Sequence, residues 1–345
     1  MIIIARKTEQ HTIVTPELWK RVSKENKDLL NEFLDYCRGK DMSHATIKGY
    51  ENDIEICWVW NLQYNDNKFF IDFTKRDILK YQNWLVNTQN LSPNRVRRLK
   101  SAISSMSNYI EAMLDDIHPN FRNIVNKIPA PVKVNVRDKT VLADEQVDEL
   151  LNYLVEKGKY QQACAVALAV SSGSRKAELL RFKVSHFTEE NIKYGALYKT
   201  PEKIKTKGRS SKGKMIYRYI LVSKFKPYFD LWMKQREELG IEGEELFWNK
   251  RNSVWKPGTI SLLNSWAITF SNILGIDWYW HSNRHYFTTA LCQANIPADV
   301  IKDVVGWEST NMVSLYNDTE IDEELGKYFD EDGIKQVENK SLSDL

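Results

Sequence analysis

Apolar positions at helical spacing dominate the first third of the chain. From residue 16 to about residue 40, leucine, valine and phenylalanine recur every three or four positions, which predicts an amphipathic helix. Similar runs follow, and the last begins at Pro93 and is expected to end near residue 115. The pattern predicts an all-α domain over residues 16–125, preceded by an irregular extension of residues 1–15.

Helix start signals mark the later helices of this domain. Ser43 precedes "HATIKGYENDIEICWVWNLQ" and has the side chain of a good N-cap. Thr74 and Asp77 have the spacing of a capping box. Ser92 followed by Pro93 places a cap directly before a proline in the first turn.

The hydrophobic pattern changes after this domain. Residues 126–140, "NKIPAPVKVNVRDKT", have two prolines and no helical period, which predicts an extended interdomain linker. A second domain is expected over residues 141–320. It opens with a helix capped near Asp144. The almost wholly apolar run "QQACAVALAV" then indicates a buried helix, and after the turn "SSGS" helix resumes at about Arg175.

Residues 193–222 have a period of two instead. The segments "YGALYKT", "KIKTKG" and "YRYILV" alternate or are β-branched, and glycine, serine and proline separate them. They predict a small antiparallel sheet, with helices filling most of the remaining sequence. The expected fold class is therefore mainly α with a small antiparallel β-sheet (α+β).

Charge is distributed unevenly. The net charge is +3, but residues 317–345 contain ten Asp or Glu and three Lys, a net of −7, so the other residues carry +10. A basic body suggests a polyanionic partner, although a solvated charged surface explains charge alone equally well. Residues 321–345 are predicted to be an acidic C-terminal tail.

Composition narrows the function classes. No run of 18 apolar residues exists and the first residues lack the features of a signal peptide, so we expect a cytoplasmic protein without membrane contact. The four cysteines lie far apart and no HExxH is present, so we expect neither a disulfide framework nor a metal site.

Two basic segments are candidate DNA contacts. The helix that starts at Pro93 opens with "PNRVRRLK", where exposed N–H groups and basic side chains would suit a phosphate. The predicted hairpin has eight Lys or Arg between residues 193 and 214 against one Glu, which is an electrostatic footprint for nucleic acid. A solvated basic face is the alternative for each. The predicted DNA-binding residues are Arg95, Arg97, Arg98, Lys100, Lys207, Arg209 and Lys212.

Candidate catalytic residues follow in a fixed order. Arg175 and Glu178 share one helix face, as do His281 and Arg284, and a surface ion pair or a structural histidine explains either pair taken alone. The turn "NIP" allows the chain to fold back, so that Tyr316 can approach Arg284.

The set resembles the tyrosine recombinase (phage integrase) family. "SSGSRKAELLRF" is similar to the box with the first arginine, "HSNRHYFTTAL" to the His-x-x-Arg box, and "VVGWESTNMVSLY" to the box that ends in the tyrosine. A single box has little specificity, whereas the ordered set is specific and covers residues 16–325. The N-terminal helices are similar to the family's core-binding (SAM-like) domain.

This resemblance implies the roles of the site residues. Arg175 and Arg284 would hold the phosphate, Tyr316 would be the nucleophile, and His281 would be a base. A hairpin lysine, Lys205 or Lys207, would protonate the leaving oxygen. Trp307 stands where the family usually has histidine, so it can donate one N–H but cannot shuttle a proton. Glu178 and His285 would support these groups, with His285 expected to point elsewhere on its helix.

The resemblance also implies the partners. We expect double-stranded DNA with specific recombination sites, in association with the nucleoid, and a C-shaped clamp around that DNA. A homotetramer on two sites is expected, with residues 321–345 exchanged between protomers, and with possible accessory DNA-bending or directionality proteins. No cofactor, metal or ATP is expected. The predicted function is the integrase of a mobile element. A Xer-type chromosome-dimer resolvase is the alternative, and a type IB topoisomerase-like enzyme or a non-catalytic DNA-binding protein are further ones.

Overall fold

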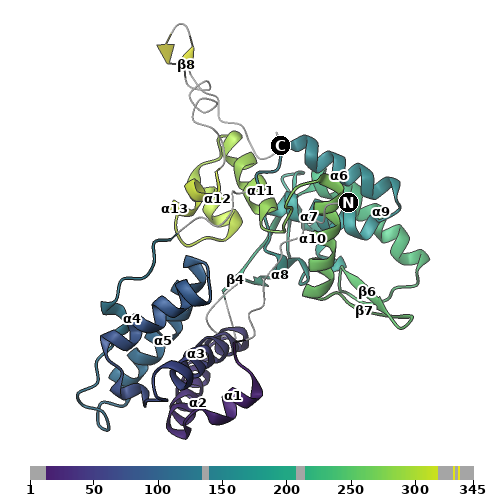
Figure 1. The fold of residues 1–345 in the computed structure, drawn as a ribbon. Helices are drawn as coiled ribbons and strands as arrows, with labels where there is room; N and C mark the ends of the chain where they lie inside the picture. Colours follow the sequence, from purple (N-terminus) through teal and green to yellow (C-terminus); the bar gives the residue numbers. More distant parts are fainter. Residues whose placement is uncertain (1–12, 134–139, 207–213, 318–328, 331–332, 335–345) are drawn as a thin grey trace. The chain divides into compact units, whose positions relative to one another are not determined.

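The computed structural model describes residues 13–133, 140–206 and 214–317, together with the paired strands β8 (Phe329–Asp330) and β9 (Gly333–Ile334). These residues form two compact units (Figure 1). The helical unit comprises residues 13–133, and the mixed unit comprises residues 140–206 and 214–317 together with β8 and β9. Most of the predicted N-terminal extension and acidic tail lies outside the described residues.

The helical unit has the predicted all-α character, with one correction. The run from residue 16 to residue 39 is two helices, because the hydroxyl of Ser23 accepts the N–H of Asn26 at 3.4 Å and starts a new helix. The elements are α1 (Pro16–Arg21), α2 (Lys24–Gly39), α3 (His44–Tyr64), η1 (Phe70–Asp72), α4 (Lys75–Asn83), the π-helical turn η2 (Trp84–Thr88), α5 (Pro93–Met113) and η3 (Val125–Lys127).

The predicted start signals are confirmed. Ser43 and Ser92 each accept a backbone N–H in the first turn of their helices. Thr74 and Asp77 form a capping box, in which each side chain accepts from the backbone N–H of the other. These caps fix where the helices begin. Aromatic side chains then fill the space between the helices, and Trp58, Trp60, Phe70 and Tyr81 lie within the core.

The mixed unit is built around a buried helix, as the apolar run predicts. Every residue of α7 (Tyr160–Ser172) from Ala163 onward is buried. The other helices are α6 (Asp144–Glu156), α8 (Lys176–Leu179), α9 (Val222–Glu238), α10 (Ile260–Leu274), α11 (Ser282–Gln293), α12 (Ala298–Val305) and α13 (Asn311–Tyr316). Short 3-10 turns, η4 (Val184–Phe187) and η5 (Glu189–Asn191), connect α8 to the first strand.

The predicted antiparallel sheet is present as two small sheets. One has the order β1-β2-β5, from β1 (Ile192–Lys193), β2 (Leu197–Lys199) and β5 (Tyr219–Leu221). The other pairs β3 (Ile204–Lys205) with β4 (Met215–Ile216), and Lys205 lies opposite Met215. The fold class predicted from the sequence is thus confirmed.

Sequence reasoning missed a second hairpin. Strands β6 (Trp248–Arg251) and β7 (Val254–Pro257) pair around a turn at Asn252 and Ser253, which both have positive φ (49° and 62°). A two-residue turn with both φ positive matches the twist of a hairpin, but asparagine followed by glycine is its usual signal. Each strand is only four residues long and the turn lacks glycine, so the periodicity signal was weak.

One glycine ends α7 where the chain must turn sharply. Gly173 has φ +56°, and a Cβ there would lie 2.6 Å from Cδ1 of Phe287 on α11. Backbone conformation and space therefore both require glycine. The turn brings the end of α7 against α11, so segments more than 100 residues apart in sequence meet.

The last helices rest on a small cluster of their own. Phe287 and Leu291 of α11 pack with Ile301 and Val305 of α12, and Tyr316 packs against the same cluster. Gly306 ends α12 with φ +80°, and a Cβ there would lie 2.2 Å from Cδ1 of Ile216. None of the helices in the described ranges is long and apolar enough to cross a membrane.

Lys100 corrects one sequence expectation. It was predicted to bind DNA, but its side chain is 5% exposed within the helical unit. Its ammonium donates to Oε1 of Gln82 at 2.6 Å and to the carbonyl of Ile128 at 2.8 Å. Because these protein acceptors occupy a buried donor, Lys100 fastens the start of the linker to α5 instead of presenting its charge to solvent.

This burial predicts a pH dependence of stability. Desolvation, with a smaller effect of Arg97, lowers the pKa of Lys100 to about 8, against about 10.4 in an unfolded chain. Between these values the unfolded state binds more protons, so Lys100 makes the folded state more stable as pH rises, by at most about 1.4 kcal/mol per pH unit. Lys100→Met should lack this increment.

The measurement is the urea midpoint of the full chain at pH 7.5 and pH 9.5. The midpoint of wild type minus that of Lys100→Met should increase with pH, whereas the same difference for Lys80→Met, an exposed lysine of α4, should stay constant. If the difference between wild type and Lys100→Met does not change between the two pH values, as for Lys80→Met, the burial of the Lys100 ammonium is contradicted.

Candidate active site

The first predicted arginine lies at the start of a short helix. Arg175 is the N-cap residue of α8, directly after the turn at Gly173. The carboxylate of Glu178 accepts the backbone N–H of Arg175 at 2.9 Å and its guanidinium Nη1 at 3.0 Å. Glu178 is 1% exposed, whereas the side chain of Arg175 keeps 28% exposure. Glu178 thus holds an arginine that still faces solvent.

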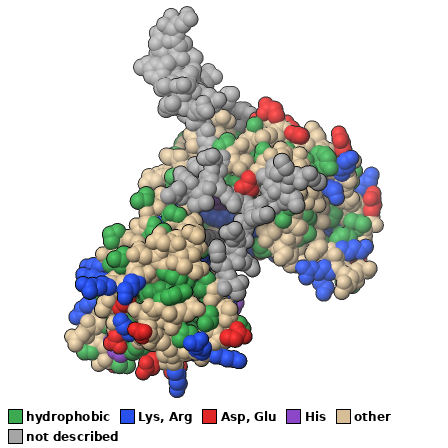
Figure 2. Space-filling model, viewed as in Figure 1, with side chains coloured by type: hydrophobic (Ala, Val, Ile, Leu, Met, Phe, Trp, Pro, Cys, Tyr) green, Lys and Arg blue, Asp and Glu red, His purple; other side chains and the backbone are tan. Residues whose placement is uncertain are grey.

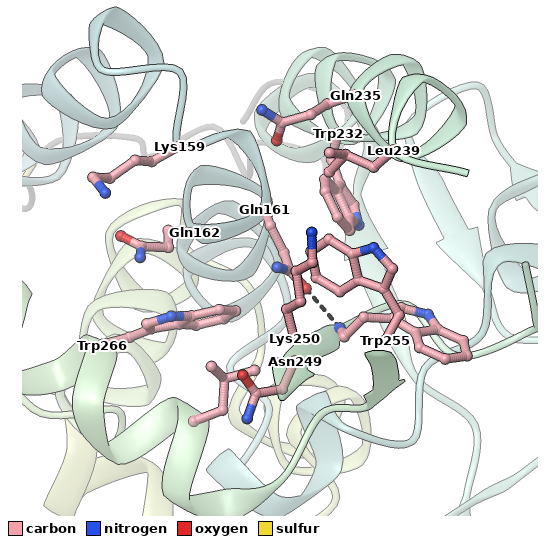
Figure 3. A pocket seen from close by; sticks show the side chains of 12 residues that line it. Lys159, Gln161, Gln162, Trp232, Gln235, Leu239, Asn249, Lys250, Trp255 and Trp266 are labelled. Atoms are coloured by element: carbon pink, nitrogen blue, oxygen red, sulfur yellow. Dashed lines mark hydrogen bonds between the residues drawn. The ribbon is translucent and has the colours of Figure 1, made fainter. Parts of the chain in front are cut away.

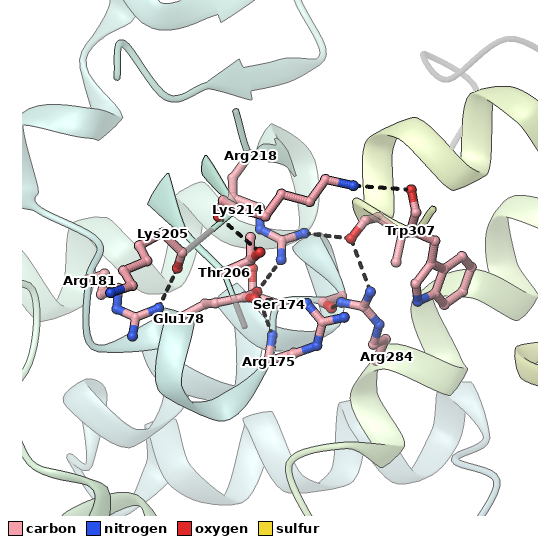
Figure 4. A network of polar contacts seen from close by, with 12 residues as sticks. Ser174, Arg175, Glu178, Arg181, Lys205, Thr206, Lys214, Arg218, Arg284 and Trp307 are labelled. Carbon is pink, nitrogen blue, oxygen red and sulfur yellow. Dashed lines mark hydrogen bonds and ion pairs between the residues drawn. The ribbon is translucent and has the colours of Figure 1, made fainter. Parts of the chain in front are cut away.

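A third arginine, which sequence reasoning missed, meets the same carboxylate. Arg218, just before β5, is fully buried and forms an ion pair with Glu178. It also donates to the carbonyl of Val305 at 2.9 Å (Figure 4). The sequence contained a signal for this burial. Side chains two positions apart in a strand point to the same face, so Arg218 is expected on the same inward face as Ile220.

The second predicted arginine is held from two sides. Arg284 on α11 has no exposed surface, and its guanidinium donates to the carbonyls of Gly173 at 2.9 Å and Val305 at 3.0 Å. Its Nε is buried without an acceptor among the described residues. Burial first, and then the charges of Arg175 and Arg218, lower the pKa of Arg284 to about 9. The site is therefore short of negative charge.

Tyr316 lies in the same site, beside residues of its own chain. Its hydroxyl is 2.6 Å from Nε2 of His281. The ring stacks on His285 at 4.3 Å with an interplanar angle of 22° and lies 4.9 Å from the ring of Trp307. The expectation that His285 points elsewhere is wrong, because its ring is a wall of the tyrosine site.

Trp307 covers the second arginine. Cζ of Arg284 lies 4.9 Å from the centroid of the Trp307 ring and 6.0 Å from that of Tyr316. Both aromatic faces thus lie against a desolvated guanidinium, an arrangement that stabilises the cation. The backbone positions Trp307 directly after the left-handed Gly306, whose small size the strand β4 requires.

The lysines of the hairpin are only partly described. Lys205 ends β3 and its carbonyl accepts from Arg181. Lys207, Arg209 and Lys212 lie outside the described residues. Lys214, which the sequence analysis did not select, extends toward the site, and its Nζ is 3.5 Å from the carbonyl of Trp307.

The basic residues of α5 in the helical unit are held by protein groups. Nη1 of Arg95 and Nε of Arg98 both bind the buried carboxylate of Asp53, at 2.6 Å and 3.0 Å. Arg97 donates to the carbonyl of Pro131 at 3.0 Å. The side chain of Arg98 nevertheless keeps 63% exposure. These arginines are oriented, and they retain donors that face solvent.

A polar groove of about 700 Å³ runs beside these arginines within the helical unit. Arg97, Arg98 and the largely buried Lys100 line it, together with hydroxyl and amide side chains and with residues 128–130 at the start of the linker. On the face seen in Figure 2, Lys and Arg side chains of this unit are interspersed with Asp and Glu. The hydroxyl and amide residues of the groove are Ser101, Ser104, Ser105, Asn108 and Asn126.

A second hollow lies in the mixed unit, away from the arginine cluster. It has a volume of about 290 Å³ and is lined by tryptophans, including Trp232, Trp255 and Trp266, and by the glutamines at the start of α7 (Figure 3). The arginine cluster is at the other end of this helix, about 20 Å away for 13 residues. None of the site residues lines it.

Metal ligands do not gather anywhere in the described part of the chain. Within it, no three His, Cys, Asp or Glu side chains are placed so that they could hold a metal ion. The donors of the arginine cluster are guanidinium and backbone N–H groups, which bind anions and not metals.

Comparison with known proteins supplies the context of this geometry. The sequence profile of the "Phage integrase family" matches residues 140–323, and that of the "Phage integrase, N-terminal SAM-like domain" matches residues 29–114. The SPbeta prophage-derived recombinase-like protein YomM of Bacillus subtilis (strain 168) is 28% identical over 270 residues, which are 76% of this chain and 77% of that protein.

Solved structures show the same fold. The XerH site-specific recombinase bound to palindromic difH substrate, a post-cleavage complex, has a TM-score of 0.61 at 18% identity and covers 89% of each chain. A lambda integrase tetramer bound to a Holliday junction has a TM-score of 0.59 at 15% identity, covering 85% of this chain and 77% of that one. Since the integrase profile alone spans more than half of the sequence, the chain belongs to the phage integrase family of tyrosine recombinases.

Proposed function

We propose that this protein is a site-specific DNA recombinase, the integrase of a mobile element, which cuts and rejoins double-stranded DNA through Tyr316. One observation carries the proposal: the hydroxyl of Tyr316 lies 2.6 Å from Nε2 of its own His281, in a site that also contains Arg284. A nucleophile, a candidate base and a buried cation are thus within one chain.

The electrostatics suit a phosphodiester. Attack on phosphorus forms a five-coordinate phosphorane with additional negative charge on its equatorial oxygens. Arg175 and Arg284 can donate in forked geometry to those oxygens, which lysine would do less well. The Nε of Arg284 is buried without an acceptor among the described residues, so it is a donor whose hydrogen bond is still unused. Fixed donors of this kind usually make the largest contribution to catalysis.

The proton transfers can be assigned to named groups. Oη of Tyr316 attacks phosphorus and loses its proton to Nε2 of His281, since tyrosine with a pKa near 10 is otherwise a weak nucleophile at neutral pH. The P–O5′ bond breaks, and the leaving oxygen takes a proton from a hairpin lysine, Lys205 or Lys207. The products are a 3′-phosphotyrosyl ester and a free 5′-hydroxyl.

The aromatic walls and the carboxylate support these steps. Trp307 would pack the site and donate an N–H to phosphate, while the stacked ring of His285 fixes the orientation of Tyr316. Glu178 orients Arg175. The scheme uses no metal ion and no ATP, because the phosphotyrosyl ester retains the energy of the broken bond and a second DNA strand can reverse the reaction.

The helical unit would contribute DNA affinity. Phosphates would bind Arg95, Arg97 and Arg98 along the polar groove, and the two units would clamp the duplex. Four protomers would assemble on two sites, with the C-terminal segment 321–345 exchanged between them; a lambda integrase of the same fold is a tetramer bound to a Holliday junction. Accessory bending or directionality proteins would act on this assembly.

Integration of a mobile element is favoured over chromosome-dimer resolution by the prophage-derived relative. A Xer-type resolvase is the alternative, because XerH has the same fold. A type IB topoisomerase-like enzyme would relax supercoiled DNA without exchanging strands, and a non-catalytic DNA-binding protein would form no covalent adduct.

Tyr316→Phe should abolish the covalent adduct with a suicide DNA substrate, because phenylalanine lacks the attacking oxygen. The measurement is the protein–DNA band on a denaturing gel, with and without EDTA. The control is Tyr194→Phe, which changes a tyrosine that is 93% exposed. An adduct that persists in Tyr316→Phe, or its absence in wild type, would refute the proposal, and loss with EDTA would refute its metal independence.

Arg97→Ala and Arg98→Ala should each weaken DNA binding uniformly across sequences and reduce the slope of log affinity against log salt by about 1, since each removes one phosphate contact. Fluorescence anisotropy between 50 and 200 mM salt measures this. Arg38→Ala, an exposed arginine of α2 paired with Asp35, is the control. The buried Lys100 predicts an unchanged slope for Lys100→Met. Unchanged slopes for Arg97→Ala and Arg98→Ala would place the DNA elsewhere.

A further inference from the structure

We propose that Arg218 is a positioning residue for the strand-transfer reaction, connecting the segment that holds Arg175 to the segment that holds Arg284. The inference rests on the proposed function of this site. Arg218 does not face solvent and is not expected to touch DNA; it acts through the groups that hold the two phosphate-binding arginines.

The contacts of Arg218 join the two halves of the site (Figure 4). Its Nη2 binds the Glu178 carboxylate, which in turn accepts both the backbone and the side chain of Arg175. Its Nη1 donates to the carbonyl of Val305, the same oxygen that accepts from Arg284. One guanidinium thus fixes a neighbour of each catalytic arginine, although residues 178 and 305 are far apart in sequence.

The backbone of Arg218 is itself fixed. Its N–H donates to Oγ1 of Thr200 and its carbonyl accepts the N–H of Thr200, each at 3.0 Å. Thr200 directly follows β2, so the sheet determines where the side chain of Arg218 begins. The planar guanidinium of Arg218 can then donate to Glu178 and to Val305 at the same time, whereas the single ammonium of a lysine could not reproduce both contacts.

The positive charge of Arg218 also helps to position Arg175, because it shares the carboxylate of Glu178. The cluster has three guanidinium groups and one carboxylate, a net of +2 before any substrate binds: Arg175 and Arg218 pair with Glu178, whereas Arg284 donates to the carbonyls of Gly173 and Val305. Without Arg218, the carboxylate of Glu178 would have one cationic partner instead of two, and would be free to pull Arg175 away from the phosphate. A buried charge that loses its partner also forces its neighbours to rearrange.

Arg218→Met should therefore lower the rate of single-turnover cleavage about 100-fold, the cost of a small misplacement of reacting groups. DNA affinity should stay within about 2-fold, because the phosphate-contacting side chains remain. The measurements are adduct formation on a suicide substrate at saturating protein, and anisotropy with the same DNA. Arg218→Lys should recover only part of the rate, since lysine keeps the positive charge but lacks the two separate N–H donors that bind Glu178 and Val305.

A double variant tests the route through Glu178. Glu178→Gln combined with Arg218→Met removes both buried charges, so its loss of rate should be smaller than the product of the two single losses. The matched control is Arg236→Met, a buried arginine of α9 that donates to the backbone carbonyls of Ile241, Gly243 and Glu245 instead of to groups of the site. It should lower the thermal midpoint and leave cleavage by the folded protein unchanged.

The outcomes are distinguishable. If wild type forms no adduct, the proposed function fails, whatever Arg218 does. If wild type forms the adduct and a folded Arg218→Met cleaves as fast, or loses affinity and rate equally, the positioning role is overturned. Should Arg218→Met fail to fold, Arg218→Lys and the double variant decide: full activity in Arg218→Lys, or losses that multiply independently in the double variant, would refute the proposal.

Discussion

The buried carboxylate of Glu178 is the interaction on which the rest of the site depends. A carboxylate with 1% exposure is costly unless it is paired and hydrogen-bonded, and Arg175 and Arg218 satisfy it from different segments. Because neither arginine alone occupies all of its lone pairs, the carboxylate draws α8 and the segment before β5 together. Arg218 then reaches Val305, and through it α12 and Arg284 are held at the same point.

Backbone carbonyls complete this arrangement. Gly173 is the C-cap residue of α7 and Val305 is the last residue of α12, so their carbonyl oxygens have no hydrogen-bond donor within the helix. The guanidinium of Arg284 donates to both oxygens. Arg284 is thus placed by helix ends and left-handed glycines and not by direct pairing with an anion. Because the cluster has three guanidinium groups and only the one carboxylate of Glu178, it keeps a net positive charge, which suits a phosphate.

Much of the candidate site could be predicted from the sequence, because its residues stand close to recognisable turn and helix-cap signals. Arg175 follows a glycine turn, and His281 and Arg284 share a helix face, so the side chains that meet could be named. Arg218 was missed because an arginine in a strand is usually exposed, and only its parity with Ile220 indicated otherwise. Lys100 shows the opposite error: a lysine in a basic run on α5 is buried, since the acceptors that bury it come from Gln82 and the linker.

Packing also explains how a tyrosine at the end of a six-residue helix is held in one place. The ring of Tyr316 is stacked on His285 and lies against Trp307, so the small cluster of α11 and α12 fixes it where the short helix alone would not. The rings of Trp307 and Tyr316 in turn lie against the guanidinium of Arg284, which has no exposed surface. Arg175 keeps 28% of its side chain exposed, so the two arginines differ in how accessible they are. The packing that holds the tyrosine in place is therefore the same packing that keeps the second arginine desolvated, where its interaction with a charge is strongest.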